Sequence, residues 1–192
     1  HGVRLTAQHT PPREPGGRVA ILLHGWEGSS RSLHVVSGAD RLWREGFRIV
    51  RINMRDHGDT HHVNLGPFRG DILDEAFAAT QQVAQWETDR PFFIIGSSLG
   101  GNFAARLAWR HSQTPLPNLA HTLAINPPLD PYNTTLKIDR SAPFYLAYFR
   151  RKWRRSFKKK QAAFPEVYDF SGAIAAPNCM TMTDAFVPFT PY

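Results

Sequence analysis

Residues 91–101 read Pro91-Phe92-Phe93-Ile94-Ile95-Gly96-Ser97-Ser98-Leu99-Gly100-Gly101. The apolar run at 91–95 is typical of a buried strand, and a helical pattern begins at Leu99 and reaches residue 110. The junction matches the pattern Gly-x-Ser-x-Gly. A sharp turn from strand to helix strains the backbone of the central serine, and only residues without bulky side chains fit around it. We therefore expect Ser98 to be an exposed nucleophile, with Gly96 and Gly100 giving the turn its room.

Apolar runs alternate with helix-period stretches on both sides of this junction. An edge strand is predicted at 2–9, buried strands at 19–23, 47–52, 91–95 and 120–125, and helices over 33–45, 72–84 and 99–110. In the first helix, Leu33, Val36 and Trp43 share one face. The alternation predicts an α/β fold: a mostly parallel sheet with helices on both faces.

A second glycine-containing loop follows the predicted strand 19–23 and reads His24-Gly25-Trp26-Glu27-Gly28. A tetrahedral intermediate of acyl transfer needs two converging N–H donors. One donor is the backbone N–H of Leu99, the residue after the nucleophile, and the other comes from the loop after an earlier strand. We expect Trp26 to supply this second N–H. His24 is expected to hold the loop through hydrogen bonds, with substrate contact as the alternative.

These two loops together resemble the α/β-hydrolase superfamily. Within it, the strings His-Gly-Trp-Glu-Gly-Ser and Ser-Leu-Gly-Gly-Asn are similar to the YheT-like branch, whose members are esterases and medium-chain acyltransferases. The resemblance implies a serine hydrolase of carboxylic esters, with acyl transfer to alcohols as a variant. It implies a hydrophobic ester or acyl substrate and no cofactor.

The partners that would activate Ser98 are not evident. The resemblance implies the chain order Ser, then Asp or Glu, then His. After Ser98 the histidines are His111, in the same predicted helix, and His121, at the start of the next strand. Neither position suits a base. Asp130, just after the fifth strand, is a minor candidate for the acid.

The resemblance places the triad acid and histidine on two further strands beyond Tyr192. We therefore interpret the chain as a C-terminally truncated hydrolase, with part of the core at 1–130 and a cap at 131–192. We expect negligible turnover from this chain alone. The strand at 120–125 would then be a bare sheet edge, which favours self-association.

The net charge of +7 comes from one segment. Residues 150–160 contain eight cations and no acid, which leaves the other residues close to neutral. Tyr145, Phe149, Trp153 and Phe157 recur every four residues, and this spacing predicts a basic amphipathic helix. Three interpretations stay open: a cap helix whose aromatic side chains cover an acyl pocket and whose cations are solvated, a helix that docks on anionic lipid, and a nucleic-acid patch. We favour the first and expect no nucleic-acid partner.

A polar cluster at 55–62 contains His57, His61 and His62 beside two aspartates. Its Arg-Asp-His-Gly turn resembles the Arg-Gly-His-Gly-like turn of α/β-hydrolases, apart from Asp56. Structural histidines are the favoured interpretation, and a metal-dependent hydrolase is an alternative. A further alternative is a non-catalytic domain that binds a partner or an anionic membrane through the basic helix.

Cys179 is the only cysteine, so an internal disulfide and a thiolate metal cage are excluded. No apolar run approaches the ~20 residues of a membrane span. We expect a cytoplasmic protein, with peripheral membrane association as the variant.

Overall fold

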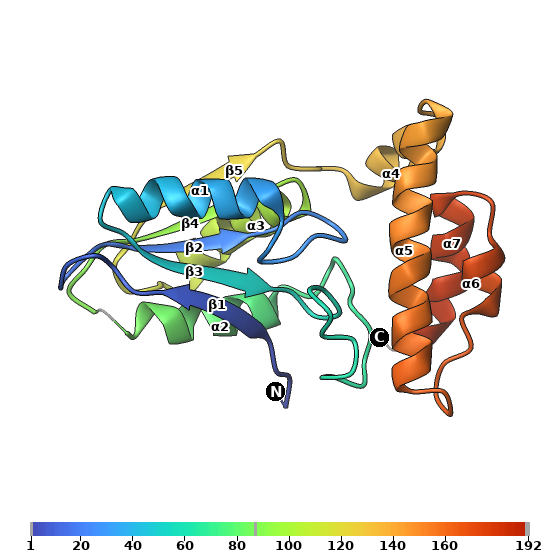
Figure 1. Cartoon of the computed structure of the whole chain (residues 1–192), viewed down its shortest axis with the longest axis horizontal. Coiled ribbons are helices and arrows are strands. Elements are labelled where there is room, and N and C mark those ends of the chain that lie inside the picture. The colour runs from blue at the N-terminus through green and yellow to red at the C-terminus, as the bar shows by residue number, and fades with distance from the viewer. Residues whose placement is uncertain (1, 87, 191–192) are drawn as a thin grey trace. The chain divides into compact units, whose positions relative to one another are not determined.

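The computed structural model describes residues 2–86 and 88–190 and divides into two compact units (Figure 1). The sheet unit comprises His1–Met54 and Gly70–Pro128, and the helical unit comprises Arg55–Arg69 and Leu129–Tyr192. The segment Arg55–Arg69 thus belongs with the C-terminal helices, a grouping that the sequence did not indicate.

The sheet unit contains five strands in the order β1-β3-β2-β4-β5. Strand β1 is antiparallel to β3, and the other neighbouring pairs are parallel. The predicted α/β class with a mostly parallel sheet is confirmed. The strands are β1 (Thr6–Thr10), β2 (Val19–Leu23), β3 (Arg48–Asn53), β4 (Phe92–Ser97) and β5 (Leu119–Ile125).

Strand β2 lies at the centre of the sheet, and every one of its residues is buried. A strand that is covered on both faces must be apolar throughout, as the sequence Val-Ala-Ile-Leu-Leu is. Strand β5 forms an edge of the sheet, and Leu123 and Ile125 are partly exposed there.

Three helices cover the sheet: α1 (Leu33–Arg44), α2 (Asp74–Ala84) and α3 (Leu99–Gln113). Figure 1 shows α1 on one face and α2 on the other, and α2 contacts α3.

The predicted inner face of α1 was right at Trp43 and wrong at Leu33 and Val36. Val35 and Ala39 are the buried residues, with Leu42 and Trp43 packed against the same cluster, whereas Leu33 is 84% exposed. Residues 35, 39 and 42 follow the i, i+4, i+7 spacing of one helix face, and Leu33 lies outside it.

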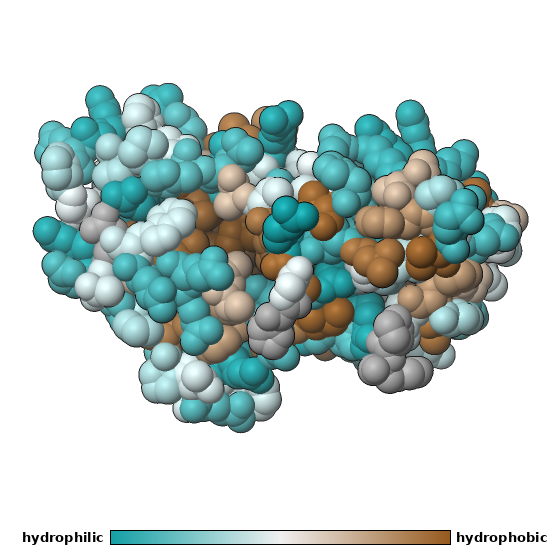
Figure 2. Space-filling model, turned by 90° about the horizontal axis from the view of Figure 1, so that it is seen from below, coloured by the Kyte–Doolittle hydropathy of each residue, from teal (hydrophilic) through white to brown (hydrophobic). Residues whose placement is uncertain are grey.

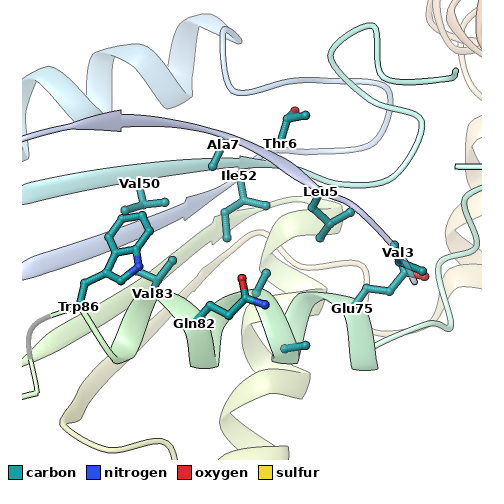
Figure 3. A pocket seen from close by; sticks show the side chains of 12 residues that line it. Val3, Leu5, Thr6, Ala7, Val50, Ile52, Glu75, Gln82, Val83 and Trp86 are labelled. Carbon is teal, nitrogen blue, oxygen red and sulfur yellow. The ribbon is translucent and has the colours of Figure 1, made fainter. Parts of the chain in front are cut away.

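A hollow lies between the sheet and α2 in the sheet unit. Figure 2 shows hydrophobic side chains gathered in it, and Figure 3 shows Leu5, Val50, Ile52 and Trp86 around it. The cavity has a volume of about 270 Å³. Its walls come from β1, β3 and α2, so it does not include the turn at Ser98.

The helical unit has its own aromatic core. Its helices are α4 (Pro131–Asp139), α5 (Pro143–Ala163), α6 (Ser171–Ala175) and α7 (Cys179–Phe186), followed by a 3₁₀ turn η1 (Val187–Phe189). Trp153 and Phe157 of α5 pack with Phe170 and Phe186. The carboxylate of Asp139 accepts hydrogen bonds from the first two N–H groups of α7, which stabilises the positive end of that helix.

Several cations of α5 bind within the helical unit and are not simply solvated as expected. Arg150 and Arg154 donate to the carbonyl oxygen of Ala176 at the end of α6, at 3.2 and 2.9 Å. Cations at that position satisfy the unpaired carbonyls of a helix C-terminus. Lys159 forms an ion pair with Asp59.

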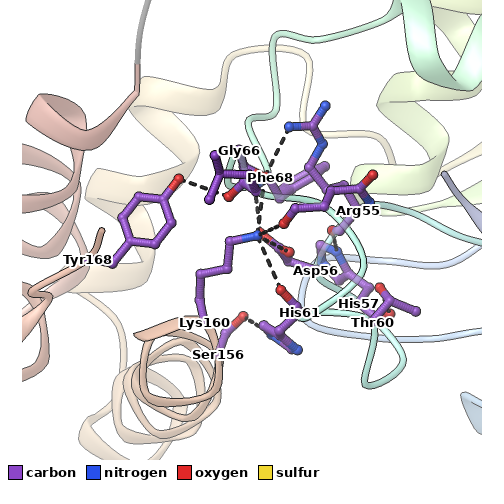
Figure 4. A network of polar contacts seen from close by, with 12 residues as sticks. Arg55, Asp56, His57, Thr60, His61, Gly66, Phe68, Ser156, Lys160 and Tyr168 are labelled. Atoms are coloured by element: carbon purple, nitrogen blue, oxygen red, sulfur yellow. Dashed lines mark hydrogen bonds and ion pairs between the residues drawn. The ribbon is translucent and has the colours of Figure 1, made fainter. Parts of the chain in front are cut away.

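The most buried cation of α5 is Lys160, which is 2% exposed. Its Nζ donates to Asp56 Oδ1 at 2.9 Å and to the carbonyl oxygen of Asn64 at 2.6 Å (Figure 4). The carbonyl oxygens of His61 and Gly66 accept longer bonds, at 3.3 and 3.2 Å. Asp56 is itself buried, and it also accepts the backbone N–H of Phe68. Lys160 therefore fixes the loop 55–69 against α5.

Replacement of Lys160 tests this role. In Lys160→Met, Asp56 stays buried without its counter-charge, so the free energy of unfolding should fall by about 3–5 kcal/mol. Lys158→Met is the matched control: Lys158 is exposed on the same helix, so its loss should change stability by less than about 0.5 kcal/mol. Urea denaturation measures both variants, and equal stability of the two would contradict the role of Lys160.

Candidate active site

Ser98 lies at the turn between β4 and α3 and has a positive φ of 52° with ψ of −122°. A non-glycine residue rarely adopts this conformation, which costs roughly 1–3 kcal/mol and persists only where the surroundings impose it. The side chain of Ser98 is exposed. The turn therefore presents its hydroxyl at the carboxyl end of β4, beside the N-terminus of α3.

The glycines around Ser98 explain how this strain is maintained. A Cβ at Gly96 would overlap the carbonyl oxygen of Gly100, and a Cβ at Gly100 would overlap that of Leu23. The backbones of β4, β2 and α3 thus approach more closely than any side chain would allow. The Ser98 N–H donates to the carbonyl oxygen of Ile125 at 2.9 Å, which ties the turn to β5 as well.

The loop after β2 lies beside Ser98. A Cβ placed on Gly25 would be 3.2 Å from Ser98 Cβ and 3.7 Å from its Oγ. The N–H of Gly28 donates to the carbonyl oxygen of Gly25 at 3.0 Å and closes a tight turn that contains Trp26 and Glu27. The structure thus brings the two loops together around the Ser98 hydroxyl. Leu99 is the first residue of α3, where the N–H groups of a helix have no partner inside it.

His24 is fully buried and is held at both ring nitrogens. Its Nε2 accepts the N–H of Met54 at 3.2 Å, and its Nδ1 lies 2.8 Å from the carbonyl oxygen of Gly25. The ring must be neutral, with the proton on Nδ1, to make both bonds. Burial lowers the pKa of His24 to about 4. The ring joins the ends of β2 and β3 and braces the loop at Gly25.

The two histidines that follow Ser98 lie far from it. His111 is in the last turn of α3, and its Nδ1 accepts the N–H of Leu116. Thirteen residues of helix separate it from Ser98, or about 20 Å. His121 pairs with Phe93 near the start of β4, five residues or about 16 Å of strand before Ser98.

Asp130 has a structural contact within the helical unit. Its carboxylate accepts the N–H of Asn133 at 2.9 Å and the side-chain amide of Asn133 at 2.6 Å, and thereby caps α4. These hydrogen bonds lower the pKa of Asp130.

The histidines of the loop 55–69 are used in packing. His61 Nε2 lies 2.7 Å from Ser156 Oγ, and burial lowers the pKa of His61 to about 4. His57 Nδ1 lies 2.7 Å from the carbonyl oxygen of Arg55, and the His57 ring packs edge-on against Phe68. His62 is exposed. Across residues 2–86 and 88–190, no group of three His, Cys, Asp or Glu side chains is placed to hold a metal, so the geometry gives the metal alternative no support.

The proposed cap aromatics differ in their surroundings. Trp153 packs inside the helical unit, whereas Tyr145 is 46% exposed and contacts Phe149 edge-on.

Sequence reasoning missed the Lys160 network, although Asp56 gave one signal: it departs from the glycine of the Arg-Gly-His-Gly-like turn. Asp56 holds a φ of 57° and pairs with Lys160.

The chain belongs to the alpha/beta hydrolase family, whose model matches residues 20–190. Comparison with curated proteins found no significant match. A thermostable carboxyl esterase from Bacillus coagulans, solved with glycerol, shares 20% identity over 60% of this chain and 37% of its own, with a TM-score of 0.50. A probable hydrolytic enzyme from Pseudomonas aeruginosa shares 17% identity over 79% of this chain and 43% of its own, with a TM-score of 0.51. The chain thus spans less than half the length of these structures, which share its fold.

The close approach at Gly100 predicts a selective effect on stability. Gly100→Ala would drive a Cβ into the backbone of β2, so the free energy of unfolding should fall by about 2–4 kcal/mol. Gly70→Ala is the control in the same unit, because a Cβ there meets no atom within 4 Å. Denaturation curves compare the two variants, and a Gly100→Ala protein as stable as Gly70→Ala would contradict the packing described.

The buried neutral state of His24 predicts a pH dependence of stability. Its folded pKa of about 4 lies below the ordinary 6.5. The free energy of unfolding therefore has its full value above pH 6.5 and decreases as the pH falls toward 4. His24 alone should lower the free energy of unfolding by about 2 kcal/mol between pH 7 and pH 5.

In His24→Asn that part of the decline should disappear, while the decline caused by His61 remains. Unfolding free energies of both proteins at pH 7 and pH 5 measure the difference. Equal declines in the two proteins would show that His24 does not resist protonation in the folded state.

Proposed function

We propose that Ser98 is the nucleophile of a carboxylic ester hydrolase. The single observation that carries the proposal is the positive φ of Ser98 at the β4–α3 turn, because it exposes the hydroxyl beside a helix N-terminus. Strain of this kind gathers at functional sites. Membership of the alpha/beta hydrolase family supports the same chemistry.

In the proposed reaction, Ser98 Oγ attacks the carbonyl carbon of an ester while a histidine base takes the hydroxyl proton. The negative charge that develops on the carbonyl oxygen is stabilised by the N–H groups of Leu99 and Trp26. The intermediate collapses, the alcohol leaves with the proton from the histidine, and Ser98 carries the acyl group. Water then attacks this acyl-enzyme, and the carboxylic acid leaves.

The base and its acid partner are proposed to come from outside residues 1–192. His111 and His121 are the histidines that follow Ser98. His111 lies about 20 Å from Ser98 along α3, and His121 pairs with a residue about 16 Å from Ser98 along β4. Residues 1–192 expressed alone should therefore give negligible ester turnover.

The similarity to the YheT-like branch suggests the substrate class. Its esterases and medium-chain acyltransferases lead us to propose an ester with a hydrophobic acyl chain, and an alcohol that replaces water as acceptor is the variant. Tyr145 and Phe149, both on α5, are the proposed contacts for such a chain. Trp153 is a weaker proposal because it packs inside the helical unit.

Substitution of Ser98 in the natural protein that contains these residues tests the nucleophile. Ser98→Ala should lower the turnover of p-nitrophenyl esters by at least about 1000-fold without unfolding the protein, because the covalent step is lost. Ser97→Ala is the matched control: its hydroxyl is buried and has no hydrogen-bond partner among residues 2–86 and 88–190, so its removal should leave turnover near wild type.

Turnover that survives in Ser98→Ala would contradict the proposal. A natural protein that neither turns over esters nor reacts with a fluorophosphonate would support the non-catalytic alternative instead.

A further inference from the structure

Seven of the eight cations of α5 fall into two sets, and Lys152 stands apart over the ring of Tyr148. Arg150, Arg154, Lys159 and Lys160 bind carbonyl or carboxylate oxygens of the helical unit. Arg151 and Lys158 are exposed, and in the part of the chain that the structure describes they have no ion pair. Arg155 is also exposed, and within the described residues it acts on Asp59 through its charge without forming an ion pair. This second set has no structural use within the described residues.

The second set lies on one face of α5 with two exposed aromatic rings. Phe144, Tyr148, Arg151, Arg155 and Lys158 follow alternating steps of four and three residues, which keep side chains on the same side of a helix. Phe144 is 77% exposed and Tyr148 is 52% exposed. We call these five residues the outer face of α5. It extends about 21 Å along the helix.

The outer face combines like charges with large exposed aromatic rings. Like charges three and four residues apart repel one another in a helix. The large aromatic rings beside them expose apolar surface to water, and a partner would bury that surface. A negatively charged partner that also accepts aromatic rings would relieve both effects.

We propose that the outer face of α5 docks the protein on the surface of an anionic membrane. Arg151, Arg155 and Lys158 would face lipid phosphates, and Phe144 and Tyr148 would enter the boundary between headgroups and acyl chains. Lys152 stands 4.9 Å over the ring of Tyr148 and adds a further cation beside the aromatic end.

The aromatic end favours lipid over nucleic acid as the partner. Phe144 has no side-chain hydrogen-bonding group, and such rings insert into the interfacial layer of a bilayer. Contacts to a phosphate backbone are made by cations and polar groups. None of the helices in the described residues is both long and apolar enough to cross a bilayer. The proposal is independent of the chemistry at Ser98.

Vesicle binding tests the proposal with the full chain. The protein should sediment with vesicles that contain 30% phosphatidylglycerol in phosphatidylcholine, and binding should weaken as salt rises. The triple variant Arg151→Ser, Arg155→Ser, Lys158→Ser should bind about 100-fold more weakly, at about fivefold per charge. The pair Phe144→Ser, Tyr148→Ser should also weaken binding, and the part that remains should be more sensitive to salt.

A triple change in α1 and the turn before it gives the matched control. Arg31→Ser, Arg41→Ser, Arg44→Ser removes the same charge from exposed positions of the sheet unit and should reduce binding by no more than a few-fold. Equal loss in both triple variants, or equal binding to pure phosphatidylcholine, would overturn the proposal. So would tighter binding to DNA or RNA than to anionic vesicles at physiological salt, which would assign the outer face to nucleic acid. Circular dichroism confirms that each variant is folded.

Discussion

The close contact between the start of α3 and the strands β2 and β4 is the constraint on which the candidate active site depends. Gly96 and Gly100 allow three backbones to meet where no side chain would fit, and the chain between them must turn through a positive φ at Ser98. The same contact brings Gly25 against the Ser98 side chain. His24 then fixes that loop, because its two ring nitrogens bind the ends of β2 and β3. The strain and the exposure of Ser98 thus have one physical origin.

The helical unit depends on a different interaction, the buried pair of Lys160 and Asp56. A charged pair in the interior is tolerated only when further hydrogen bonds satisfy both groups, and three carbonyl oxygens of the loop 55–69 supply them for Lys160. This accounts for a loop that follows β3 in sequence but belongs with α5. The basic segment therefore contains two sets of cations on one helix. Arg150, Arg154, Lys159 and Lys160 hold the helical unit together, and we propose that those of the outer face meet a membrane surface.

Most of the fold could be predicted from local sequence because its signals are local. The run at 19–23 is apolar throughout and becomes the buried central strand, and the glycines at 96 and 100 mark a turn that few other residues could form. The Lys160 network could not be predicted, since its partners lie about 100 residues apart in sequence and a lysine in a cationic run looks solvated. The inner face of α1 was misjudged for a related reason: tertiary packing, not the first apolar residue, selects the buried side.

The most direct measurement of the central claim is to locate the covalent adduct by peptide mapping. The natural protein is treated with a fluorophosphonate, digested, and analysed by mass spectrometry. One adduct per chain is expected, on the peptide that contains Ser98, because the proposed histidine base activates this hydroxyl and the proposed N–H groups of Leu99 and Trp26 stabilise the charge that develops during attack. An adduct on another residue, or ester turnover that continues while Ser98 stays unmodified, would contradict the account.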